Sequence, residues 1–174
     1  ARQALIDINH LANLEYVQVG NGRLTIGALA REQAIEHSAE IARDFPMLHD
    51  AALVIADPLV RNRATVGGNL AHADPANDHP AVMLAYDAEV VARGPGGTRT
   101  IPIDELFVGL FETSLAHDEL LTEIRIPLPG PGAGGAYIKQ ERKVGDYAVS
   151  AAAVQLTLQG GRCTAERVAL KNVS

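Results

Sequence analysis

Apolar and polar residues alternate along several short segments of the chain, which is the pattern of half-buried strands. Two pairs of these segments are separated by glycine-rich turns and therefore predict β-hairpins. Other alternating segments stand alone and predict single strands, most of them in the C-terminal half. Strands are expected at residues 4–8, 16–19, 23–26, 89–93, 99–103, 119–128, 136–144, 147–159 and 163–170, with turns at 20–22, 94–97 and 160–161.

Apolar residues three or four positions apart predict helices in the segments between the hairpins. The first helix is expected within residues 29–38, and a second one begins at Ser38, whose hydroxyl can cap it. Pro46 separates the second helix from a third at residues 47–56. Residues 79–88 predict a short helix and residues 104–107 a single helical turn.

The strongest break in this pattern is the Pro- and Gly-rich segment Pro129–Gly135. It predicts a boundary between a first domain at residues 1–128 and the start of a second domain at residues 129–174. Strands and helices do not alternate regularly on either side of it. The sequence therefore predicts an α+β fold, with a mostly antiparallel sheet and helices in the first domain and an antiparallel sheet in the smaller second one.

Composition narrows the classes of function. Hydrophobic residues make up 47% of the 174 residues, enough for a core, and the formal net charge is −6. Lysine and arginine are scattered without a basic stripe, which argues against a nucleic-acid partner. No apolar run approaches the roughly 20 residues of a transmembrane helix.

The chain has a single cysteine, Cys163, expected to be buried or to lie in a strand. One thiol cannot form an internal disulfide, which fits a reducing compartment and hence a cytoplasmic protein. It also cannot hold an iron–sulfur cluster, which typically needs about four cysteines. If the protein carries electrons, any such cluster lies on another chain.

The segment "RATVGGNLAHADPANDHPA" contains most of the candidate chemistry. Thr65 and Val66 predict a short strand that opens into a loop at Gly67 and Gly68. Glycines in such a loop can aim successive backbone N–H groups at an anion such as a phosphate. The spacing matches neither a nucleoside-triphosphate loop nor a dinucleotide fingerprint, so a tight turn without a ligand stays equally open.

A metal site is the second hypothesis for this segment. Its ligands would be His72, Asp74, Asp78 and His79, which could hold zinc or non-haem iron. Prolines at two nearby positions disturb the spacing, and the aspartates have simpler roles. Asp74 can start a turn, and Asp78 can cap the helix that follows. No arrangement typical of a nucleophilic hydrolase is present, and the histidines elsewhere in the chain are expected at the surface.

Three separated motifs, "RNRATVGGNLAHADPANDHPAV", "DELLTEIRIP" and "AYIKQERKVGDYAVSAAA", resemble the FAD-binding medium subunit of molybdenum hydroxylases. This family includes aerobic carbon monoxide dehydrogenases and xanthine dehydrogenases. The resemblance implies an FAD-binding α+β domain followed by a smaller domain with a three-stranded antiparallel sheet. It also implies two partners, an iron–sulfur subunit with 2Fe–2S clusters and a subunit that holds the molybdenum cofactor. Electrons would pass from these partners through FAD to quinone, NAD or oxygen.

The resemblance also assigns cofactor-binding residues and no catalytic ones. The Thr65–Asn69 segment would hold the FAD diphosphate through backbone N–H groups, Ile55 and Leu121 would contact the rings, and Lys139 would reach the flavin from the second domain. The family has a further glycine-rich loop, which is expected upstream of residue 4, so the chain is expected to carry about half of the FAD site. Two alternatives stay open: a flavin-free interaction module of the same fold, and the metal-dependent enzyme described above. The implied cofactor-binding residues are Ile55, Thr65, Val66, Gly67, Gly68, Asn69, His72, Asp78, Leu121 and Lys139.

Overall fold

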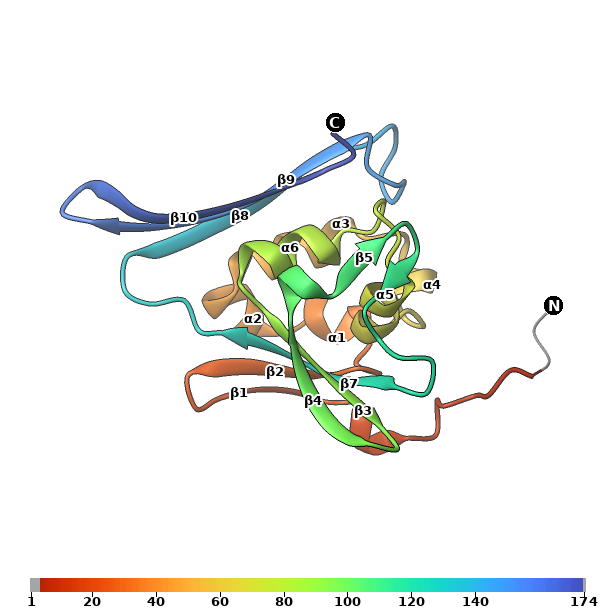
Figure 1. The fold of residues 1–174 in the computed structure, drawn as a ribbon. Coiled ribbons are helices and arrows are strands. Elements are labelled where there is room, and N and C mark those ends of the chain that lie inside the picture. The colour runs from red at the N-terminus through yellow and green to blue at the C-terminus, as the bar shows by residue number, and fades with distance from the viewer. Residues whose placement is uncertain (1–3, 174) are drawn as a thin grey trace.

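The computed structural model describes residues 4–173, which form three layers. A five-stranded antiparallel sheet lies on one side, a three-stranded antiparallel sheet lies on the other, and helices fill the space between them (Figure 1). Both hairpins predicted from the alternating pattern are present in the larger sheet, on either side of its central strand. In spatial order its strands are β1 (Val17–Gly20), β2 (Arg23–Gly27), β7 (Leu120–Pro127), β3 (Glu89–Gly94) and β4 (Gly97–Pro102).

The helices are short, and several begin at a residue suited to cap them. Ser38 accepts a hydrogen bond from the Ile41 N–H and starts the second helix, as its sequence predicts. Asp57 caps the fourth helix in the same way, through the Val60 N–H. The helices are α1 (Glu32–Glu36), α2 (Ala39–Asp44), α3 (Pro46–Val54), α4 (Pro58–Arg61), α5 (Val66–His72) and α6 (His79–Ala85), with 3-10 turns η1 (Ala12–Leu14) and η2 (Ile103–Glu105).

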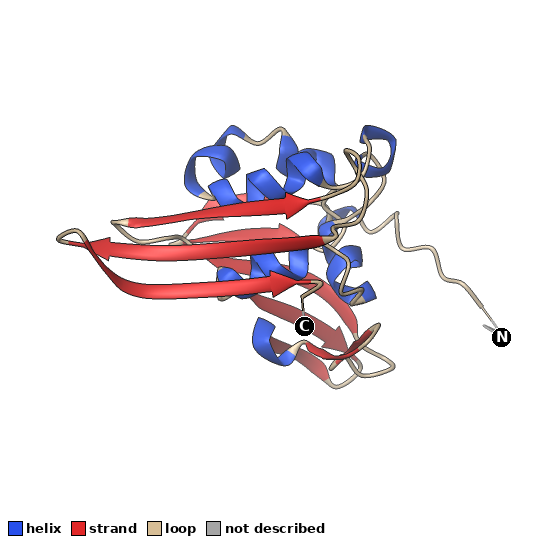
Figure 2. Cartoon of the chain, turned by 90° about the horizontal axis from the view of Figure 1, so that it is seen from above, coloured by secondary structure: helices blue, strands red, loops and turns tan. Residues whose placement is uncertain are grey.

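The smaller sheet lies across the helices, as the view from above shows (Figure 2). It contains β10 (Arg162–Lys171), β9 (Ser150–Gln159) and β8 (Ala133–Gln140), in that order. One face packs against α3 and α6. Its inward side chains, including Tyr137 and Ala153, join the same hydrophobic core as the larger sheet. The predicted second domain thus shares a hydrophobic core with the first. The division at Pro129–Gly135 remains a prediction.

Several predicted elements differ from the structure. Residues 4–8 pair with no strand, and Leu5 and Ile6 are exposed, because alternation alone supplies no neighbouring edge. The third expected helix ends at Val54, and α4 follows it unpredicted. A small hairpin of β5 (Phe107–Gly109) and β6 (Glu112–Thr113) occupies the region after the expected helical turn. The predicted break already contains the first residues of β8, and Cys163 lies in β10 but is exposed.

Candidate functional site

A cavity of about 720 Å³ opens where the end of α3, α4, α5 and the loop between β8 and β9 meet. Its size lies in the range of small-molecule and cofactor sites. One part of its wall is apolar, and the rest carries amides, a hydroxyl and charged groups. The lining residues are Ile55, Ala56, Val60, Arg63, Ala64, Thr65, Gly68, Asn69, His72, Asn77, Asp78, Lys139, Gly145, Asp146 and Tyr147.

The segment predicted to be a glycine loop is the first turn of helix α5. Thr65 is its N-cap residue, and the Thr65 Oγ1 accepts a hydrogen bond of 3.1 Å from the Gly68 N–H. The N–H groups of Val66 and Gly67 donate to carbonyl oxygens in the segment after β2, both at 3.1 Å. The expectation of a loop with free N–H groups is therefore wrong, because the Thr65 hydroxyl and the carbonyl oxygens of the segment after β2 already accept hydrogen bonds from these groups.

The two glycines of α5 differ in what they contact. A Cβ on Gly67 would lie 2.6 Å from the Cα of Ala28, so this glycine permits close packing of α5 against the chain after β2. A Cβ on Gly68 would approach only the Thr65 Oγ1, at 2.7 Å, and Gly68 is exposed in the cavity wall. Gly67 thus has a packing role, whereas Gly68 faces the cavity.

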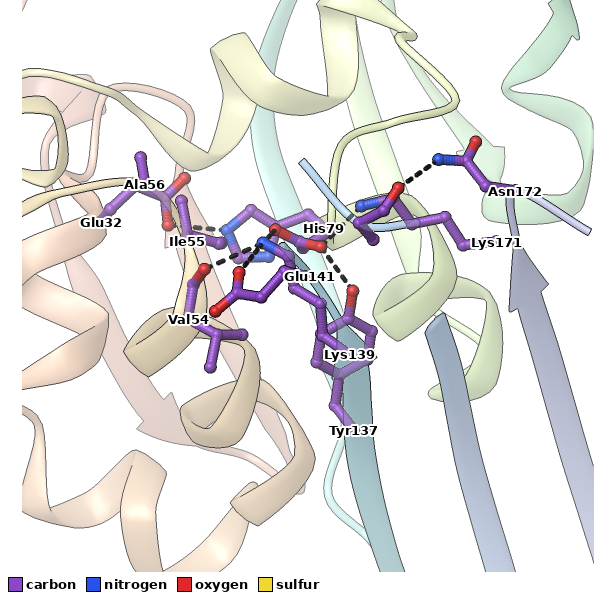
Figure 3. Close-up of polar contacts among 12 residues, drawn as sticks. Glu32, Val54, Ile55, Ala56, His79, Tyr137, Lys139, Glu141, Lys171 and Asn172 are labelled. Carbon is purple, nitrogen blue, oxygen red and sulfur yellow. Dashed lines mark hydrogen bonds and ion pairs between the residues drawn. The ribbon is translucent and has the colours of Figure 1, made fainter. Parts of the chain in front are cut away.

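Asp78 lies at the centre of a buried polar cluster beside the cavity. Its Oδ1 accepts hydrogen bonds from the Tyr137 hydroxyl and from the Lys171 Nζ, the latter at 2.6 Å. Its Oδ2 accepts one of 3.0 Å from the Lys139 Nζ. Figure 3 shows these side chains converging from β8 and β10. Asp78 precedes α6 but makes no side-chain cap, so that expectation is wrong: its carboxylate is bound by the smaller sheet instead.

Lys139 links this cluster to two further groups. Its Nζ donates to the carbonyl oxygen of Val54 at 2.9 Å and lies 3.4 Å from the Glu141 Oε2. Burial and the neighbouring Asp78 raise the pKa of Tyr137, so its hydroxyl stays protonated and acts as a donor. Burial lowers the pKa of Lys171, while the hydrogen bond to Asp78 opposes this shift.

His79 and Glu32 form a second buried pair, at a distance of 2.7 Å between His79 Nε2 and Glu32 Oε2. Both side chains have zero exposure, and neither lines the cavity. Burial alone would lower the pKa of His79, but the charge and the hydrogen bond of Glu32, together with the charge of Asp78, outweigh burial and the pKa is raised. The pair binds no other described side chain: Glu32 Oε1 and His79 Nδ1 have no hydrogen-bond partner.

The predicted metal ligands do not converge. His79 is sealed against Glu32, Asp78 is bound by two lysines, and His72 Nε2 lies 3.9 Å from the Asp74 carboxylate. Within residues 4–173 no group of three or more histidine, cysteine, aspartate or glutamate side chains has the geometry to hold a metal ion. Asp74 has the predicted turn role, since its Oδ1 accepts a hydrogen bond of 2.8 Å from the Ala76 N–H.

The chain matches one known protein family over most of its length. Residues 1–129 match the model of the FAD binding domain in molybdopterin dehydrogenase. The chain belongs to this family. It is 42% identical to the carbon monoxide dehydrogenase medium chain of Hydrogenophaga pseudoflava, over 98% of this chain and 59% of that protein. It is 41% identical to 6-hydroxypseudooxynicotine dehydrogenase complex subunit alpha of Paenarthrobacter nicotinovorans, over 94% of this chain and 56% of that protein.

Solved structures of the family confirm the predicted α+β fold with antiparallel sheets. Carbon monoxide dehydrogenase from Hydrogenophaga pseudoflava superimposes with a TM-score of 0.93 at 42% identity, over 97% of this chain and 58% of that one. Quinoline 2-oxidoreductase from Pseudomonas putida 86 gives a TM-score of 0.88 at 32% identity, over 96% and 58%. The chain thus spans somewhat more than half the length of these relatives. No helix among residues 4–173 has the length and apolar character to cross a membrane.

The structure brings together most, but not all, of the residues that the family resemblance implies. Val66 and Gly67 lie behind the cavity wall, buried in α5. Leu121 is buried in β7 within the hydrophobic core and does not line the cavity. His72 is largely exposed and its ring packs on Phe111, with 5.2 Å between the centroids. The members that line the cavity are Ile55, Thr65, Gly68, Asn69, His72, Asp78 and Lys139.

The site also contains residues that the sequence motifs do not predict. Arg63 and Asn77 line the cavity, and both stand inside the motif already quoted for its glycines and histidines. Tyr137 and Lys171 do not line the cavity, but they donate hydrogen bonds to Asp78, which does. Tyr137 stands two residues before Lys139, on the same face of β8, which is a signal that strand alternation offers. Nothing in the sequence pairs residue 171 with residue 78.

Proposed function

We propose that this chain forms the core of the FAD site in the electron-transfer subunit of a molybdenum hydroxylase. The observation that carries the proposal is the cavity beside α5, because it gathers seven of the residues implied by the resemblance, from positions 55 to 139. Family membership supports the same cofactor. FAD would accept and release electrons there, and the protein would bind and orient it.

The cavity fits a ligand that is apolar at one end and anionic at the other. Ile55, Ala56 and Val60 offer an apolar wall against which a flat ring system can exclude water. Arg63 and Lys139 bring positive charge to the wall, which favours a diphosphate. The Asn69 Oδ1 is buried without a hydrogen-bond partner in the described structure, so it is an acceptor available to a ligand donor.

The residues of the wall would bind and orient FAD without acting as acids or bases on an organic substrate. Asp78 is held by three donors, so its carboxylate presents a fixed acceptor to polar groups of the cofactor. Thr65 fixes the start of α5 and with it the position of Gly68 and Asn69. A substrate of the complete complex would be converted elsewhere, on a partner subunit.

The proposal extends to partners and location. The electrons would come from 2Fe–2S clusters on an iron–sulfur subunit, which a molybdenum-cofactor subunit reduces, and they would leave to quinone, NAD or oxygen. The single cysteine supports this division, because the chain cannot ligate such a cluster itself. It also supports a cytoplasmic location.

A fluorescence titration of FAD against the full-length subunit tests the proposal, with two cavity-blocking variants, because this chain is expected to carry only about half of the site. Val60→Trp places an indole in the cavity wall, and Gly68→Val adds a branched side chain there. We expect the wild-type protein to bind one FAD per chain and both variants to bind at least about tenfold more weakly. Leu59→Trp and Gly20→Val are the matched controls, because neither residue lines the cavity and Gly20 has open space around its Cβ position.

Two outcomes would contradict the proposal. If the wild-type protein does not bind FAD, the flavin-free interaction module becomes the better interpretation. If Val60→Trp and Gly68→Val bind as tightly as their controls, FAD binds somewhere else. The double variant His72→Ala/Asp74→Ala addresses the metal hypothesis, which expects this pair to matter more than Gly68. Circular dichroism spectra of all variants establish that each one is folded.

A further inference from the structure

Lys171 is a buried cation in a position where a strand usually places an apolar residue. It is the last residue of β10, on the face that packs against the helices and two residues after the buried Ala169. Its side chain is only 2% exposed. Lysine is rarely buried to this degree unless it is paired. Among the described residues, its side chain makes one hydrogen bond, from Nζ to the Asp78 Oδ1 at 2.6 Å.

Lys171 does not line the cavity, whereas Asp78 does. The two oxygens of the Asp78 carboxylate are used differently. Oδ1 points to Lys171 and Tyr137 behind the wall, and Oδ2 points to Lys139, which lines the cavity. Lys171 can therefore influence a ligand in the cavity only through Asp78 and through its charge.

The charges of the cluster show what Lys171 contributes. Asp78 and Glu141 carry two negative charges, and Lys139 and Lys171 carry two positive ones. Without Lys171, Lys139 would face two carboxylates alone, and this cluster beside the cavity would carry a net negative charge. A negative cluster repels an anionic ligand, and in a buried environment such a charge is weakly screened.

We propose that Lys171 is a positioning residue of the cofactor site: it fixes the Asp78 carboxylate from the side away from the cavity and offsets its charge, so that the wall formed by Asp78 and Lys139 does not repel an anionic cofactor. This inference rests on the proposed function, because it takes FAD as the ligand. It assigns a role in cofactor binding to a residue on the far strand of the smaller sheet, outside the segment that matches the FAD-binding family model.

The test replaces Lys171 in three matched variants of the whole chain. Lys171→Met removes the charge and keeps the length of the side chain, Lys171→Arg keeps the charge, and Lys143→Met removes a charge from an exposed lysine. FAD affinity is measured by fluorescence titration, and the midpoint potential of the bound flavin by equilibration with redox dyes. Thermal unfolding of the FAD-free proteins reports stability separately.

We expect Lys171→Met to bind FAD roughly tenfold more weakly, the lower end of what loss of a supporting partner costs at well-studied metal sites. The bound flavin should have a more negative midpoint potential, because reduction adds negative charge beside a wall that has lost a cation. Lys171→Arg should restore both values toward those of the wild type, and Lys143→Met should change neither. A residue that served only the stability of the fold would alter the unfolding temperature without altering the potential.

The outcomes separate this inference from the proposed function. If the wild-type protein and Lys143→Met bind FAD and Lys171→Met matches them in affinity and potential, the role of Lys171 is refuted and the proposed function stands. If Lys171→Arg fails in the same way as Lys171→Met although it is folded, the charge argument is wrong. If the wild-type protein binds no FAD, the proposed function fails and this inference fails with it.

Discussion

Asp78 and His79 are adjacent in the sequence but lie in opposite environments. Asp78 accepts hydrogen bonds from three side chains and has an edge in the cavity wall. His79 has zero exposure and one partner, Glu32, and both members of that pair keep a polar atom without a hydrogen bond. Successive side chains at the start of α6 thus point to the ligand cavity and to the sealed core.

This difference separates two uses of buried charge. A cluster whose central carboxylate accepts from three donors holds its geometry and can present one edge to a ligand. A sealed pair that is only partly satisfied offers nothing to a ligand, and removing one partner leaves the other charge without compensation. We therefore assign the Asp78 cluster to cofactor binding and the Glu32–His79 pair to the stability of the fold, and the following changes test that assignment.

Glu32→Ala should have the largest effect on stability. It leaves His79 buried without its partner, and loss of one member of a buried ion pair costs about 3–5 kcal/mol. Urea unfolding followed by circular dichroism measures the change. Glu40→Ala, at an exposed position of α2, is the control and should change little. The double variant Glu32→Met/His79→Leu should lose less than Glu32→Ala alone, because it leaves no buried charge without a partner. An equal or greater loss would show that the unpaired His79 is not the cause of the loss in Glu32→Ala.

The pH dependence of stability should next reveal the contribution of the Glu32–His79 pair. The pKa of His79 is raised above its ordinary 6.5 in the folded protein. A raised pKa means that the folded state binds the proton more tightly, so this contribution is complete below about pH 6.5 and is lost as the pH rises through the folded pKa. Urea midpoints of the wild type should therefore fall as the pH rises above that value. In Glu32→Gln this fall should shrink, and a parallel fall in both proteins would assign it to other groups.

Tyr137→Phe should have a smaller effect, because Asp78 keeps both lysines. It removes one hydrogen bond to the carboxylate, and such a bond contributes about 1 kcal/mol, or somewhat more when the partner is charged. Thermal unfolding measures the loss, with Tyr147→Phe as the control because Tyr147 is exposed. A loss as large as that of Glu32→Ala would mean that Asp78 depends on a single donor, and that the contrast with His79 is wrong.

The sequence predicts the strands better than it predicts the α5 segment, for a physical reason. Strand alternation with period two survives in parts of β7 and β9, where one face packs on the helices. In α5 two glycines lower helix propensity and hide a helix of seven residues, although Thr65 is a suitable cap. The sequence thus marks this segment as important but does not predict its helical backbone.

The candidate site shows a similar limit. Ile55, Asp78 and Lys139 were placed in the site by resemblance to a family, and the structure brings all three to the same cavity. Lys171 was missed, because its partner lies 93 residues earlier and the contact exists only once β10 pairs with β9 in its observed register. Local pattern alone cannot supply a contact that depends on the register of a distant strand.

The smallest effect on stability is expected at a surface ion pair. It gives a reference against which the losses at the two buried sites can be compared. Arg99 donates two hydrogen bonds of 2.7 Å to the Glu119 carboxylate, and the hydrogen bond from Arg99, assisted by the Ala116 N–H, lowers the pKa of Glu119 to about 2. A lowered carboxyl pKa stabilises the fold above the ordinary value of 4.5 and loses that contribution as the pH falls toward 2. Water and salt screen this pair, so Arg99→Ala should cost less than Tyr137→Phe.

Salt should separate the surface pair from the buried pair. At about 1 M salt the screening length falls to roughly 3 Å, so the difference in unfolding free energy between wild type and Arg99→Ala should shrink, down to what the hydrogen bond from Arg99 to the Ser114 carbonyl oxygen contributes. The difference between wild type and Glu32→Ala should persist, because ions cannot enter a site with zero exposure. Urea unfolding of the three proteins at low and high salt measures both differences. Equal salt sensitivity would mean that Glu32 and His79 are reached by solvent, and their assignment to a sealed stabilising pair would then be wrong.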